Sequence, residues 1–99
     1  MPKRELYAKA VAKWGVDSQL DMLVEECSEL IQAVQKMKRY ERWKQGHPRE
    51  LSDSLCEELA DVSIMVEQVS TIMGSAVVEV CRRKALDRLE KMVNEEPAI

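Results

Sequence analysis

Apolar residues recur every three or four positions along most of the chain, which is the period of an amphipathic α-helix. The pattern is interrupted at Gly15, at residues 45–48 (Gln-Gly-His-Pro) and at Gly74, where the residue types commonly end helices. The pattern therefore predicts four helices, over residues 3–14, about 19–44, 52–73 and 75–93, and a frayed tail from about residue 94. The residues that can cap the last three helices are Asp17 or Ser18, Ser52 and Ser75. Long helices with short connections favour an all-α fold, an antiparallel four-helix bundle in one domain over residues 1–99.

The second and third helices should each bury one apolar stripe. On the second helix the stripe consists of Leu20, Leu23, Cys27, Leu30, Ile31, Val34 and Met37. On the third helix it consists of Leu55, Leu59, Val62, Met65, Val66, Val69 and Met73. These two stripes are expected to form most of the core.

Acidic residues interrupt both stripes. Glu26 lies at the edge of the second helix's stripe, and Glu29 lies about 60° further round. On the third helix, Glu58 falls inside the stripe and Asp61 lies at its border. A buried carboxylate without a partner costs several kcal/mol, so these inward acids need an explanation. Residues three apart on a helix are about 5–6 Å apart and packed helices about 8–10 Å, so the four acids can converge on a hard cation, Mg²⁺ or Mn²⁺.

The fourth helix carries the opposite charge on its apolar face. Val77, Val80 and Cys81 begin this face, which is expected to look into the bundle, and Lys84, Arg88 and Lys91 continue it. Such a basic stripe either covers apolar surface with its aliphatic stems or binds an anion. Acids that hold a metal, with cations nearby, are typical of phosphoryl-transfer sites.

Composition narrows the possible partners and the setting. The chain has 99 residues, of which 45% are hydrophobic and 33% charged, and a domain this small has a thin core that a dimer or tetramer would complete. The net charge of −3 disfavours a nucleic-acid partner, and no apolar run is long enough to cross a membrane. The odd set of Cys27, Cys56 and Cys81 contains no CxxC pair, which predicts buried free thiols in a reducing, cytoplasmic compartment.

The two acidic segments resemble a known family. Residues 25–30 (Glu-Glu-Cys-Ser-Glu-Leu) and 57–62 (Glu-Glu-Leu-Ala-Asp-Val) are similar to the EExxE…EExxD signature of the MazG-like, all-α nucleoside triphosphate pyrophosphohydrolases. Members of that family carry a Lys four residues ahead of an Arg or Asn on the last core helix, and Lys84 and Arg88 have this spacing. The resemblance extends from about Trp14 to Lys91.

The resemblance implies a Mg²⁺-dependent hydrolase that cleaves an NTP or dNTP to NMP and pyrophosphate, in nucleotide-pool housecleaning. It implies that the metal ligands and catalytic residues are Glu26, Glu29, Glu58 and Asp61. It implies also that Lys84 and Arg88 contact the phosphates. Trp14 and Gln19, at the start of the second helix, are candidates for stacking on the base and reading its edge, although packing for Trp14 and capping or exposure for Gln19 are ordinary alternatives.

Two other classes of helical protein, a di-iron carboxylate bundle and a non-catalytic module, are alternatives to the hydrolase. A di-iron carboxylate bundle requires Glu-x-x-His on two helices, and the single His47 is not placed to supply it. A non-catalytic helical interaction or regulatory module of the same fold would tolerate the loss of any acid, yet all four acids are present. Glu25 and Glu57 point away from the stripes and are expected to be surface charges.

Overall fold

The structure is a computed structural model that describes residues 1–42 and 49–95. Within these residues it contains four α-helices and no strand: α1 (Lys3–Trp14), α2 (Val16–Arg42), α3 (Arg49–Met73) and α4 (Ser75–Asn94). The prediction of an all-α fold with four helices is therefore confirmed, and the bounds of α1 match the prediction. The predicted break at residues 45–48 and the end of the predicted tail lie outside the described residues.

The predicted helix caps are wrong. Both α2 and α3 begin three residues earlier than expected, so Asp17, Ser18 and Ser52 lie inside helices. Ser75 is the first residue of α4, and Gly74 precedes it as the cap without any side-chain hydrogen bond. The Gly15 carbonyl accepts the first hydrogen bond of α2, from the Gln19 N–H at 3.2 Å, and the Gly74 carbonyl accepts that of α4, from the Val78 N–H at 3.2 Å.

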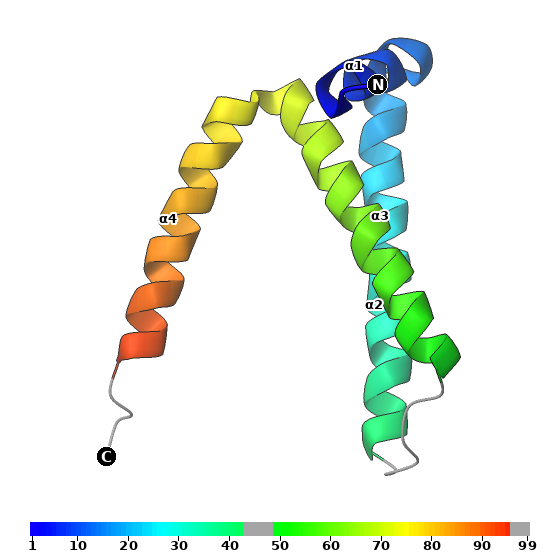
Figure 1. The fold of residues 1–99 in the computed structure, drawn as a ribbon, viewed down its shortest axis with the longest axis vertical. Coiled ribbons are helices and arrows are strands. Elements are labelled where there is room, and N and C mark those ends of the chain that lie inside the picture. The colour runs from blue at the N-terminus through cyan, green and yellow to red at the C-terminus, as the bar shows by residue number, and fades with distance from the viewer. Residues whose placement is uncertain (43–48, 96–99) are drawn as a thin grey trace.

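Two glycines make the tight connections possible. Gly15 has a φ of 85° and Gly74 a φ of 100°, values that are costly for residues with a Cβ. Each glycine changes the chain's direction within one residue, so that a new helix starts immediately. These connections place α1 across the ends of α2 and α3, and α4 beyond α3 (Figure 1).

The pair of α2 and α3 is the main packed unit of the chain. The two helices run antiparallel over most of their length, and α1 contacts both of them near the start of α2 and the end of α3 (Figure 1). The buried apolar residues are Tyr7, Ala33, Met65 and Val69, and the buried polar residues are Gln19 and Gln68. The core of the single chain is accordingly small.

Several residues expected in the core are exposed. The exposed members of the two predicted stripes include Leu20, Ile31, Val34, Leu59, Val66 and Met73. The expectation that the whole of each stripe is buried is therefore wrong, because the one neighbouring helix covers only part of such a wide stripe. The remainder is exposed in the single chain.

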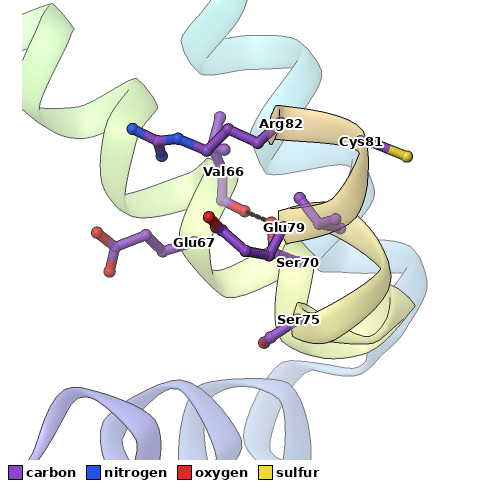
Figure 2. A pocket seen from close by; sticks show the side chains of 8 residues that line it. Val66, Glu67, Ser70, Ser75, Glu79, Cys81 and Arg82 are labelled. Carbon is purple, nitrogen blue, oxygen red and sulfur yellow. Dashed lines mark hydrogen bonds between the residues drawn. The ribbon is translucent and has the colours of Figure 1, made fainter. Parts of the chain in front are cut away.

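The fourth helix diverges from the rest of the chain. Among the described residues its backbone approaches only α3, with which it forms a V that opens away from Gly74 (Figure 1). No residue of α4 is buried, and Val77, Val80 and Cys81 are exposed, so the expectation that this face looks into the bundle of its own chain is wrong. A crevice near the apex of the V is lined by Val66, Glu67, Ser70, Ser75, Val78, Glu79, Cys81 and Arg82 (Figure 2).

The three cysteines are free, as predicted, but they are not all buried. Cys27 is half-buried, whereas Cys56 and Cys81 are exposed in the single chain. None of the described helices is both long enough and apolar enough to span a membrane.

Candidate metal centre

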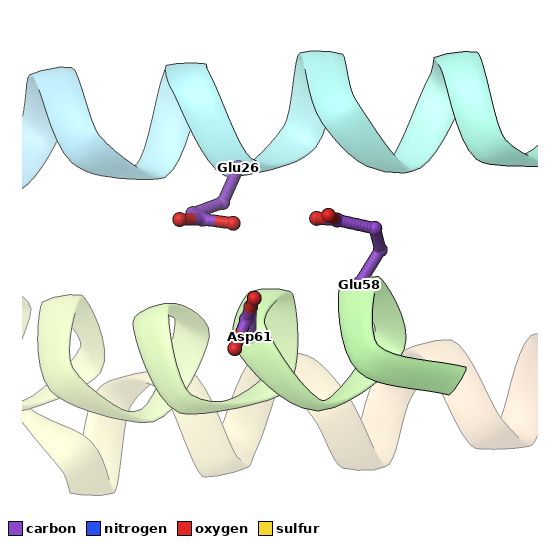
Figure 3. A group of neighbouring side chains, drawn as sticks. All are labelled: Glu26, Glu58 and Asp61. Carbon is purple, nitrogen blue, oxygen red and sulfur yellow. The ribbon is translucent and has the colours of Figure 1, made fainter. Parts of the chain in front are cut away.

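Three acidic side chains from α2 and α3 converge in the groove between the two helices. Glu26 extends from α2, and Glu58 and Asp61 extend toward it from α3 (Figure 3). One carboxylate oxygen from each residue lies within 4.8 Å of the others. The convergence follows from antiparallel packing, because the i, i+3 spacing of Glu58 and Asp61 places both acids on the face of α3 that meets α2.

The two glutamates at the centre of this cluster lack partners. Glu26 and Glu58 are half-buried, and the Oε2 atom of each is fully buried without a hydrogen bond among the described residues. No Lys or Arg of the described part of the chain forms an ion pair with either glutamate. Buried carboxylate oxygens are nearly always paired in stable proteins, so this arrangement is costly without a ligand.

The surroundings favour the protonated form of both glutamates. Burial is the first cause that raises the pKa of Glu26, followed by repulsion from Glu29, Asp61 and Glu58. The pKa of Glu58 is likewise raised by burial and then by Glu29 and Asp61. A divalent cation would reverse this balance, because it neutralises the repulsion and occupies the empty acceptor sites.

The other acids near this sequence motif are the predicted ligands Asp61 and Glu29 and the predicted surface charges Glu25 and Glu57. Asp61 is exposed, and Glu29 is half-buried, close enough to act on the pKa of both central glutamates although it is not one of the three converging residues. Glu25 and Glu57 are exposed, as predicted. The donor set is thus all oxygen and acidic, which fits Mg²⁺ or Mn²⁺ and not a metal that prefers nitrogen or sulfur.

The predicted phosphate residues do not approach these acids within the chain. Lys84 and Arg88 are exposed on α4, and α4 contacts only α3 among the described elements. Lys84 lines a shallow hollow on α4 itself, together with Val80 and Asp87. A surface outside the single chain is needed to bring this basic stripe and an acidic cluster together.

Trp14 and Gln19, the two residues predicted to contact the nucleobase, line the same pocket. Trp14 is 57% exposed, whereas Gln19 is only 2% exposed, contrary to the expectation that Gln19 caps a helix or faces solvent. Both line a pocket together with Gln68 of α3, which donates a hydrogen bond from Nε2 to Gln19 Oε1. Gln68 was not among the residues expected from the sequence, although it lies near Met65 on the stripe and interrupts the stripe with a polar side chain, as Glu58 does.

Comparisons with known proteins bear on this site. The family model described as the MazG nucleotide pyrophosphohydrolase domain matches residues 15–97, a range that contains all the converging acids. Neither the curated proteins nor the solved structures compared with the chain give a match. The match covers most of the chain, and the chain therefore belongs to the MazG nucleotide pyrophosphohydrolase domain family.

Proposed function

We propose that the protein is a Mg²⁺-dependent nucleoside triphosphate pyrophosphohydrolase, which converts an NTP or dNTP to NMP and pyrophosphate in nucleotide-pool housecleaning. The observation that carries the proposal is the pair of buried, unpartnered oxygens of Glu26 and Glu58 beside Asp61. Membership of the family supports the reaction class. The free cysteines are consistent with a reducing, cytoplasmic setting.

Four acids of the chain hold the metal in this proposal. Glu26, Glu58 and Asp61 provide the converging oxygens, and Glu29 completes the set from the next turn of α2. When bound there, the divalent ion neutralises phosphate charge and polarises a water for attack on phosphorus. The half-buried position of Glu26 and Glu58 limits competition from bulk water, which strengthens each charge interaction.

The basic stripe of α4 binds the phosphates in a homodimer or a homotetramer. Lys84 and Arg88 would come from an α4 that lies across the groove of another copy, and the substrate is then held at a subunit interface. The exposed apolar residues of α4 support such an assembly; they are Val77, Val80, Leu86, Leu89, Met92 and Val93. A stable monomer at micromolar concentration in sedimentation would contradict this part of the proposal.

The direct test is a panel of standard and modified NTPs and dNTPs with Mg²⁺, with pyrophosphate and orthophosphate measured separately. We expect pyrophosphate with at least one member of the panel and no product in the presence of a chelator. Orthophosphate as the first product would contradict the proposed bond cleavage. No product with any nucleotide would instead favour a non-catalytic helical module of the same fold.

A further inference from the structure

A second feature of the groove between α2 and α3 lies beside the acidic cluster. It is a pocket of about 400 Å³ lined by Trp14, Ser18, Gln19, Met22, Met65 and Gln68. Most of its wall is apolar, and two amide side chains are the buried polar groups among its lining residues. An apolar pocket with a few well-placed polar groups is the usual form of a small-molecule site.

The two glutamines of the pocket retain unused hydrogen-bonding groups. Gln19 is 2% exposed and Gln68 is 7% exposed, and Gln68 Nε2 donates to Gln19 Oε1. This bond does not use the two N–H groups of Gln19 or the carbonyl of Gln68, and neither Gln19 Nε2 nor Gln68 Oε1 is among the fully buried, unpartnered atoms of the described residues. The pair therefore has donors and an acceptor available to a ligand at one place in the pocket lining.

The pocket and the acids are aligned along the same groove. Glu26 follows Gln19 by seven residues on α2, and Asp61 precedes Gln68 by seven residues on α3. Seven residues are almost two helical turns, or about 10 Å along the helix, so the two sets share one face. A ribose and its first phosphate can bridge this distance between a base in the pocket and a metal at the acids.

Trp14 provides the third part of the pocket. Trp14 is one of the lining residues while 57% of it is exposed, and Lys13 Nζ lies over its ring at 5.2 Å from the centroid. An exposed indole face at the edge of a pocket suits stacking on a planar base.

We infer that the Gln19–Gln68 pair determines base specificity by hydrogen bonding to the Watson–Crick edge of the nucleobase, while Trp14 stacks on its face. The inference rests on the proposed function and adds Gln68 to the residues that contact substrate. The substrates are nucleotides whose base has an intact Watson–Crick edge, on which every standard base presents an adjacent donor and acceptor. Nucleotides methylated at the ring nitrogen of the edge are poor substrates, because the methyl group removes one hydrogen bond to the pair and clashes with it.

The test compares each standard nucleoside triphosphate with its counterpart methylated at that ring nitrogen. For the preferred base, wild type should favour the unmodified nucleotide by about 10- to 100-fold in kcat/KM. Gln19→Met and Gln68→Met should each bring this ratio close to one, mainly through a higher KM for the unmodified nucleotide. An unchanged ratio in both variants would overturn the inference and leave the pair as a structural contact between α2 and α3.

Matched controls separate specificity from folding. Gln32→Met makes the same change at an exposed position of α2 and should leave the ratio unchanged. Trp14→Ala alters an exposed side chain, so the fold is retained, and it should raise KM for all nucleotides without changing the ratio between methylated and unmodified forms. A loss of thermal stability in Gln68→Met without a change in the ratio counts against the inference.

A binding measurement distinguishes failure of this inference from failure of the proposed function. In a Trp43→Phe background Trp14 is the sole tryptophan, and a nucleoside monophosphate should quench its fluorescence without Mg²⁺. Quenching that is lost in Gln19→Met and Gln68→Met supports the pocket even if no nucleotide is hydrolysed. Hydrolysis by wild type with no quenching and no base discrimination would support the proposed function and contradict the inference that this pocket binds the base.

Discussion

Helix α3 carries carboxylates at two places, and their surroundings are opposite. Near its C-terminal end, Glu67 accepts a hydrogen bond from the Tyr7 hydroxyl at 2.7 Å and forms an ion pair with Lys3 at 3.2 Å. Two to three turns earlier, Glu58 shares the groove with Glu26 and neither has a partner for its buried oxygen. The first carboxylate connects α1 to α3. The acids of the second set lie close together without partners, which destabilises the fold when no cation is bound.

The pKa values express the same contrast. The Tyr7 hydroxyl, with Lys3 beside it, lowers the pKa of Glu67, whereas burial and neighbouring acids raise the pKa of Glu58 and Glu26. A carboxylate whose charge is favoured needs no further ligand, and one whose charge is disfavoured is stabilised by a cation. The comparison therefore separates a structural contact from a candidate ligand site on one helix.

The largest effect is expected from removing one unpartnered acid. Glu58→Gln preserves shape but removes a metal-binding charge, so Mg²⁺-dependent turnover should fall by about 1,000-fold or more. Helicity measured by circular dichroism should be unchanged. Glu57→Gln, the exposed neighbour, should retain near-wild-type activity. If Glu58→Gln hydrolyses nucleotide at the wild-type rate, the unpartnered oxygens are not part of the active site.

The second prediction tests whether the acidic cluster receives its cations from α4. Lys84→Ala and Arg88→Ala should each cost about 2–4 kcal/mol of transition-state stabilisation, or roughly 30- to 900-fold in kcat/KM. Arg88 can bind two phosphate oxygens at once, whereas Lys84 acts as a point charge. Mg²⁺ or Mn²⁺ binding without nucleotide, measured by calorimetry, should be unchanged or slightly tighter. Normal hydrolysis by both variants would show that α4 presents only a solvated basic surface.

The sequence predicted what depends on local pattern. The bounds of α1 followed from the helical period and from Gly15, and the inward acids followed from the interruption of two stripes. The direction of α4 could not be predicted, because Gly74 allows a reversal without specifying the angle between the helices it joins. The pairing of Gln19 with Gln68, and of Tyr7 with Glu67, depends on how separate helices align, which no single helix encodes. The exposure of the valines of α4 could not be predicted either, because it depends on the angle between α3 and α4.

The third prediction breaks the partnered carboxylate. Tyr7 is 5% exposed, and Tyr7→Phe removes the hydroxyl that donates to Glu67, which should lower Tm by about 4–8 °C. Lys3→Ala removes only an exposed ion pair and should have a much smaller effect. Turnover should be unchanged in both variants, because this contact is on the α1 side of α3. A loss of activity in Tyr7→Phe at a temperature where it is folded would contradict the structural role of the contact.

The smallest effect is expected in the pH dependence of stability, and it has opposite signs at the two places. A raised pKa in the folded state means that Glu58 contributes most below its ordinary value of 4.5 and that the contribution is lost as pH rises through the raised pKa. A lowered pKa means that Glu67 contributes above 4.5 and that its contribution is lost as pH falls through the lowered pKa. Without metal, the Tm of Glu58→Gln relative to wild type should therefore increase with pH, and that of Glu67→Gln should decrease. Added Mg²⁺ should raise the Tm of wild type and of Glu67→Gln but not that of Glu58→Gln, since binding stabilises only a protein that retains the site. Parallel pH profiles for the two variants would show that the two carboxylates do not differ in the way the hydrogen bonds and burial indicate.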